Sequence, residues 1–174
     1  MKKILKHKHE IFLTSLVLFS VYLSLAEALI PKPFPWMKIG LANIATLIAL
    51  EKFNSKMAFE VVILRVLIQA IMFGTLFTPS FIISLSAGVV SSGITVFFYR
   101  FRNYLSMVAI SSLSAFIHNI FQLIIVYFLM FRGIELDSKS IYIFIFFFLG
   151  LGVISGALIG IIIEKLSLRR GGDL

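Results

Sequence analysis

The sequence predicts an all-α integral membrane protein, a bundle of six membrane-spanning helices in one domain over residues 1–174. Of the 174 residues, 60% are hydrophobic and 14% are charged, whereas a soluble domain carries roughly a quarter charged residues. The mean hydropathy is +1.05. The apolar residues also lie in long runs separated by short basic stretches, which is typical of a membrane protein.

Six apolar segments are the candidate helices, because a helix that crosses the bilayer needs about 20 apolar residues. They are residues 11–30, 36–50, 57–77, 80–99, 104–131 and 141–163. The first follows a basic start, as in a signal peptide, but Pro31 comes after it instead of a small-residue cleavage site, so we expect a retained helix. The second has only about 15 residues, and we expect it to be short, tilted or partly re-entrant.

The basic residues predict the orientation in the membrane. With six crossings both termini lie on one side, which then carries eleven basic residues against four on the other. Basic loops remain in the cytoplasm, so both termini are predicted to face the cytoplasm. The basic residues that give the chain its net charge of +8 then lie near anionic lipid headgroups. Because the lipid accounts for this charge, we expect no nucleic-acid partner.

The composition argues against an enzyme. The chain has no cysteine, and its eight acidic residues are not clustered. Asp137 and Asp173 are its only aspartates, so a carboxylate site for the metal ions that handle diphosphates is not expected. A Gly-rich ATP-binding loop is also missing from the sequence. We therefore expect no catalytic residue, metal or cofactor, and any energy must come from a partner or an ion gradient.

Polar residues inside the predicted helices are the candidate binding residues. An ionisable group in the bilayer costs about 2.5–3.5 kcal/mol and needs a partner or a wet cavity. Arg65 and Gln69 are four residues apart, as are His118 and Gln122, so each pair shares a helix face. Such residues line a ligand cavity or hydrogen-bond to neighbouring helices, and the sequence leaves both open. The candidates are Glu27, Lys38, Asn43, Arg65, Gln69, His118, Asn119 and Gln122.

Arg65 and Glu27 are not expected to pair directly. From the predicted helix ends their depths differ by roughly 13 Å, while an arginine side chain reaches about 7 Å. Carbonyls of a broken helix or an acid on a ligand are better partners for Arg65, and snorkelling toward the cytoplasm is the alternative. Glu27 is expected near Lys32 or Lys38. The proline-rich residues 31–36 predict a stiff outer loop, either a lid or an aromatic anchor.

Small residues recur every four positions on several predicted helices. Gly152, Gly156 and Gly160 form one such ridge, and Ser20, Ser24 and Ala28 form a weaker one. Ridges of this kind let helix backbones approach closely. They serve packing within the bundle or docking of a partner membrane protein.

Residues 27–44, which read EALIPKPFPWMKIGLANI, resemble the signature of a bacterial membrane family known as Gx transporters, also described as heptaprenyl diphosphate synthase component I. The resemblance continues through Arg65-Val66, residues 74–77, residues 84–92 and His118-Asn119, and so covers most of the chain.

Within that resemblance, the six-helix plan is similar to the substrate-binding subunit of energy-coupling-factor vitamin transporters. The resemblance implies capture of a vitamin, a flavin or an isoprenoid precursor from outside, beneath the loop between the first two helices. It also implies docking on a transmembrane coupling subunit driven by ATPases. Glu27, Lys38, Asn43 and Arg65 become the leading residues for binding or gating. The alternatives are a membrane partner of a prenyl diphosphate synthase in quinone synthesis and a structural subunit of a membrane complex.

Overall fold

The computed structural model describes residues 2–31, 40–132 and 139–168, which form six α-helices and no strand. The helices are α1 (Lys2–Ala28), α2 (Asn43–Lys52), α3 (Ser55–Met72), α4 (Pro79–Tyr99), α5 (Met107–Met130) and α6 (Lys139–Leu168). The predicted all-α class and the predicted number of helices are thereby confirmed.

Local sequence signals set the starts of three helices. The Asn54 side chain accepts a hydrogen bond from the Met57 amide (2.8 Å) at the start of α3. The Ser106 hydroxyl accepts one from the Ala109 amide (3.1 Å) at the start of α5. Pro79 begins α4, where the missing amide hydrogen costs nothing. Capping residues and proline thus fix where these three helices begin.

Two glycines explain two of the differences between predicted and observed helix ends, while α1 and α6 extend beyond the predicted apolar segments at the ends predicted to face the cytoplasm. Gly40 has a φ of +95°, and its carbonyl accepts from the Asn43 amide, so α2 begins at Asn43 instead of near residue 36. Gly74 has a φ of +64° just after α3, which ends at Met72 instead of near residue 77. Arg65 therefore lies about 10 Å from the end of α3 at helical rise, closer than expected.

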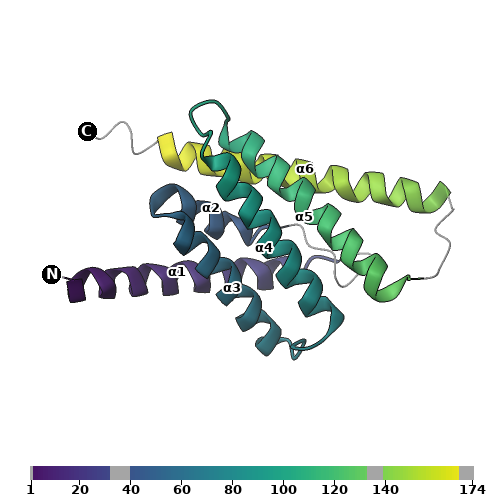
Figure 1. Ribbon diagram of the computed structural model, residues 1–174, viewed down its shortest axis with the longest axis horizontal. Coiled ribbons are helices and arrows are strands. Elements are labelled where there is room, and N and C mark those ends of the chain that lie inside the picture. Colours follow the sequence, from purple (N-terminus) through teal and green to yellow (C-terminus); the bar gives the residue numbers. More distant parts are fainter. Residues whose placement is uncertain (1, 32–39, 133–138, 169–174) are drawn as a thin grey trace.

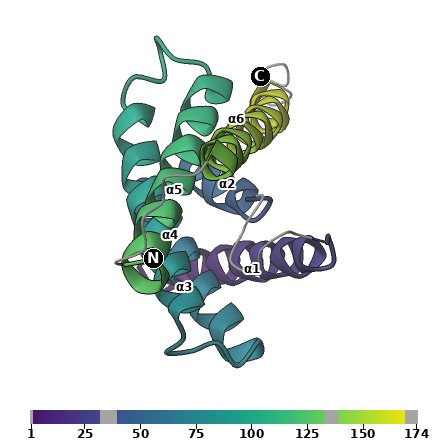
Figure 2. The same cartoon turned by 90° about the vertical axis from the view of Figure 1, so that its right-hand side faces the viewer.

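The short helix α2 lies inside the bundle and joins its parts. It packs against α1, α3 and α6, while α5 packs against both α4 and α6. The first turn of α1 and the last turn of α6 lie at the same end of the bundle (Figure 1). Viewed from the side, α2 lies between α1 and α6 (Figure 2). With ten residues it is about 15 Å long, half the thickness of a bilayer core.

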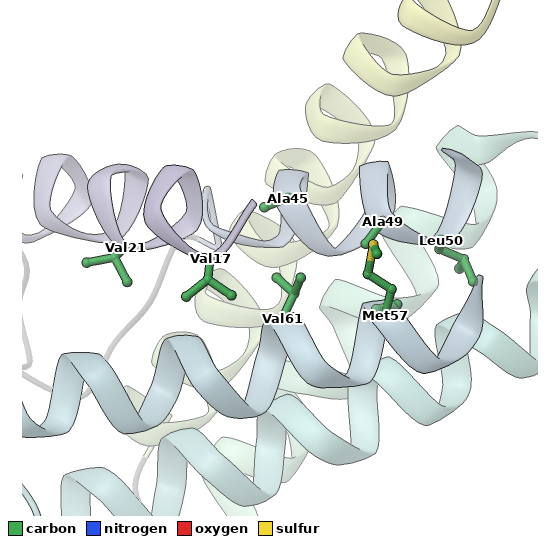
Figure 3. Packing of buried hydrophobic residues seen from close by; sticks show 8 residues of the cluster. Val17, Val21, Ala45, Ala49, Leu50, Met57 and Val61 are labelled. Carbon is green, nitrogen blue, oxygen red and sulfur yellow. The ribbon is translucent and has the colours of Figure 1, made fainter. Parts of the chain in front are cut away.

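The apolar core beside α2 is built from three helices. Val17 and Val21 of α1, Ala45, Ala49 and Leu50 of α2, and Met57 and Val61 of α3 pack together (Figure 3). Ala45, Ala49, Met57 and Val61 are completely buried. The small alanines let α2 approach α3 closely, which fixes the position of Asn43 at the start of α2.

Within the described ranges, four helices are long and apolar enough to cross a membrane: His7–Ala28, Pro79–Tyr99, Met107–Met130 and Lys139–Ser167. Large apolar side chains such as Phe146 (83% exposed) and Ile143 (70%) project outward from α6, as expected of a face in contact with lipid. The chain is thus a multi-pass membrane protein. α3 has the length of a span but carries Lys56, Glu60 and Arg65.

Candidate functional site

A cavity of about 650 Å³ lies where five helices meet. It is bounded by the end of α1, the start of α2, the second half of α3, the first half of α4 and the middle of α5. All of these segments lie toward the end of the bundle away from the first turn of α1. Its polar lining residues include Ser24, Glu27, Asn43, Arg65, Gln69, Ser84 and His118.

Glu27 holds the backbone that leads into α2. One of its carboxylate oxygens, Oε2, accepts hydrogen bonds from the backbone amides of Gly40 and Leu41, both at 3.0 Å. The residue is buried, with 4% of its surface exposed. Two amide donors stabilise a buried carboxylate, so Glu27 closes one wall of the cavity and ties α1 to the turn before α2.

Arg65 places a guanidinium in the same wall. Its Nη1 donates to Asn43 Oδ1 over 3.3 Å, a long hydrogen bond between α3 and α2. Its Nε is buried and has no hydrogen-bond partner among the described residues. Glu27 also interacts electrostatically with Arg65. Because α3 ends earlier than predicted, Arg65 lies closer in depth to Glu27 than expected, and that the two do not pair directly stays a prediction.

The remaining predicted residues divide between the cavity and the packed bundle. Gln69 and His118 line the cavity, and His118 Nδ1 is 3.2 Å from the Ser91 hydroxyl of α4. Asn119 instead donates to the Phe148 carbonyl of α6 (3.0 Å), which is the helix-joining role. Gln122 is completely buried and does not line the cavity.

Two predictions concern residues outside the described ranges. Lys38 and Lys32 lie there, as does most of the predicted loop over residues 31–36. Of that loop the structure describes Pro31, which lines the cavity. The predicted roles of Lys38 and of the lid remain predictions.

The glycine ridge of α6 is used inside the bundle. A Cβ atom at Gly156 would lie 2.7 Å from the Ser111 carbonyl oxygen, and one at Gly160 would lie 2.5 Å from Val108 Cα. At Gly152 it would meet Asn119. The ridge therefore packs against α5, which is one of the two roles that the sequence allowed, and this face is already covered within the chain.

The small-residue ridge of α1 also faces inward for most of its length. The Ser20 hydroxyl donates to the Ala42 carbonyl (3.1 Å), and Ser24 and Ala28 line the cavity. Ser20 is completely buried. Its contact, like that of the glycine ridge, is with the same chain, and nothing in the described residues points to a partner there.

Sequence reasoning missed a second polar space beneath the cavity. It has a volume of about 20 Å³ and lies between α2, α4, α5 and α6, with Asn43 lining both spaces. Thr46, Ser91 and Thr95 are among the hydroxyl side chains around it. Room for one water molecule needs about 10–15 Å³. The signal in the sequence was the spacing of Ser91 and Thr95, four residues apart on one face of α4.

A charged network at the opposite end of α2 was also missed. Glu51 accepts hydrogen bonds from the Tyr99 hydroxyl (2.9 Å) and the Ser167 hydroxyl (2.7 Å). Arg102 lies 3.9 Å from Glu51 and 3.7 Å from Glu164. These residues come from α2, α4, the turn after α4 and α6, so the network joins three helices.

Within the described part of the chain, no three His, Cys, Asp or Glu side chains lie close enough to hold a metal ion. What the cavity offers is one buried guanidinium, one carboxylate bound by backbone amides, and amide, hydroxyl and imidazole groups among apolar walls. Such a set binds a ligand by hydrogen bonds and charge.

The comparisons with known proteins give one match. A family model described as heptaprenyl diphosphate synthase component I matches residues 16–166, most of the chain and every helix that lines the cavity. No curated protein and no solved structure matches the chain.

Proposed function

The chain belongs to the heptaprenyl diphosphate synthase component I family, and from its cavity we propose that it is the small-molecule-binding subunit of a membrane transport system. The observation that carries the proposal is the cavity of about 650 Å³, whose lining includes Glu27, Asn43, Arg65, Gln69 and His118. Ligand sites typically have volumes of 300–1,000 Å³ and mostly apolar walls with a few polar groups.

The proposed topology places the cavity on the outer side of the bacterial inner membrane. All six helices cross or enter the bilayer, both termini are cytoplasmic, and the ligand enters at the end of the bundle away from them. The bias of basic residues toward the termini supports this orientation. Since the sequence has no ATP-binding loop, a coupling subunit with ATPases, or an ion gradient, supplies the energy.

Filling the cavity tests this function. Ala70 of α3 lines the cavity and is 3% exposed, whereas its neighbour Ile71 is 67% exposed on the outer face. We expect protein purified in detergent to retain a small molecule that native mass spectrometry detects. Ala70→Phe should abolish retention, and the matched variant Ile71→Phe should retain the molecule as the unchanged protein does.

A second filling variant guards against misfolding. Ser84 lines the cavity from α4, so Ser84→Phe fills it from another helix. Thermal unfolding in detergent shows whether each variant is folded. The proposal fails if the unchanged protein retains nothing, or if folded Ala70→Phe and Ser84→Phe proteins both retain the molecule at the unchanged level.

A second candidate function is favoured by the name of the family. In it the chain is a membrane partner of a soluble prenyl diphosphate synthase and supplies no catalytic residue of its own. Adding the purified chain in lipid nanodiscs to such a synthase should then raise its rate of chain elongation. Equal rates with loaded and empty nanodiscs would discard this candidate.

A further inference from the structure

We infer that the ligand of the cavity is an amphiphilic acid, whose carboxylate or phosphate group binds the guanidinium of Arg65 while its apolar part fills the rest of the space. This inference rests on the proposed function and names the class of its ligand. It starts from Arg65, which is 6% exposed and carries a hydrogen-bond donor, Nε, with no partner among the described residues.

The described residues offer the Arg65 guanidinium few hydrogen-bond acceptors. A guanidinium has five N–H donors in a planar fork. The structure gives Arg65 one hydrogen bond, from Nη1 to the neutral amide oxygen of Asn43, and at 3.3 Å this bond is long. A charge-assisted bond to an acid is shorter, near 2.7–2.9 Å, and about twice as strong. An acidic group would therefore be the better acceptor in this cavity.

Glu27 does not take the place of that acceptor. It lies in the same wall and interacts electrostatically with Arg65. However, its Oε2 already accepts from the amides of Gly40 and Leu41, which holds the carboxylate toward the turn before α2. Glu27 thus lowers the cost of burying the Arg65 charge, yet Nε stays without a hydrogen bond. Nε itself has almost no accessible surface, so a ligand acceptor would reach this guanidinium through its Nη groups, since Arg65 is a lining residue of the cavity.

The rest of the lining defines the other part of the ligand. The apolar lining residues include Val66 and Ala70 of α3, Phe73 just after it, Phe81 of α4 and Ala28 of α1. Gln69 and His118 are further polar lining residues, available to a second functional group. A ligand with one acidic end and an apolar body fits this division, whereas a sugar or a small inorganic anion would leave the apolar walls without contacts.

The test uses the molecule that the purified protein retains. We expect it to give a negative ion in mass spectrometry after extraction, with an acidic group. Arg65→Gln should lower its affinity at least tenfold, and Arg65→Lys should lower it less, because a lysine keeps the charge but loses the fork. Arg100→Gln, at an exposed arginine just after α4, is the matched control and should bind as the unchanged protein does.

A measurement on the unchanged protein keeps the inference testable if Arg65 variants do not fold. The methyl ester of the extracted acid keeps the apolar body and removes the charge. We expect the acid to compete for binding and its ester to be at least tenfold weaker. A retained molecule that is neutral, or an ester that competes as well as the acid, would overturn this inference and leave the proposed function standing. Retention of no molecule would overturn both.

Discussion

Two regions of the bundle differ in how much space they leave between helices. Along the contact of α5 with α6, three glycines bring the backbones so close that a single added carbon would clash. Between α1, α3 and α4 the same bundle leaves a cavity of about 650 Å³. At this cavity Glu27 binds the backbone amides of Gly40 and Leu41, and Arg65 binds the Asn43 side chain, so polar contacts join the helices where the apolar packing is open.

The first test of this difference adds a methyl group where α6 packs against α5. In Gly160→Ala the new Cβ would lie 2.5 Å from Val108 Cα and 2.8 Å from the Met107 carbonyl oxygen, both backbone atoms that cannot rotate away. Overpacking of this kind costs about 1–3 kcal/mol. We expect a lower midpoint of thermal unfolding in detergent.

Gly150→Ala is the control for that variant. It lies on the same helix, and an added Cβ there meets nothing within 4 Å. We expect its unfolding midpoint to equal that of the unchanged protein or to exceed it, because alanine favours a helix. Equal midpoints for Gly160→Ala and Gly150→Ala would contradict the close packing of α5 on α6.

The sequence predicted the helices well because long apolar runs have few other structures in a membrane. It predicted the start of α2 and the end of α3 poorly, since Gly40 and Gly74 act through a backbone conformation that composition does not reveal. The error at Gly74 also affected the expected position of Arg65. With α3 extended to residue 77, Arg65 was expected roughly 13 Å from Glu27 in depth, and the observed end at Met72 brings it closer.

The candidate site shows the same limit of sequence reasoning. Five of the eight predicted binding residues line one cavity, because an ionisable or amide group within a membrane helix must face a polar space or a partner. Asn119 follows His118 in the chain, and one residue turns a helix by 100°, so the two side chains face different neighbours. The sequence alone could not show which of these two side chains faces the cavity, because that depends on where α4 and α6 lie.

The second test compares the two ends of α2. Asn43 contacts a guanidinium that keeps a free donor, whereas Glu51 is bound by the Tyr99 and Ser167 hydroxyls and lies beside Arg102. We expect Glu51→Gln to lower the free energy of unfolding by about 1–2 kcal/mol, since it weakens hydrogen bonds to a charged group. Ligand retention should be unchanged, because Glu51 is not a lining residue.

Unfolding midpoints and native mass spectra of the Glu51→Gln protein provide both measurements. Lys52→Gln is the matched control, since Lys52 is exposed at the end of the same helix. Loss of the ligand at unchanged stability would show that the end of α2 near the termini takes part in binding, and the distinction between a structural end and a binding end would fail.

The smallest expected effect on stability is that of Asn119→Ala. Comparing this variant with Gln69→Ala distinguishes an amide that joins two helices from an amide that binds the ligand. The Asn119 side chain donates to the Phe148 carbonyl at 3.0 Å and is 3% exposed. Polar contacts between membrane helices contribute about 0.6 kcal/mol on average, so Asn119→Ala should lower the unfolding midpoint only slightly. The retained molecule should stay bound, whereas Gln69→Ala, which alters the lining of the cavity, should weaken it severalfold. If instead Asn119→Ala released the molecule and Gln69→Ala did not, the ligand would lie between α5 and α6, in the region that the glycines close.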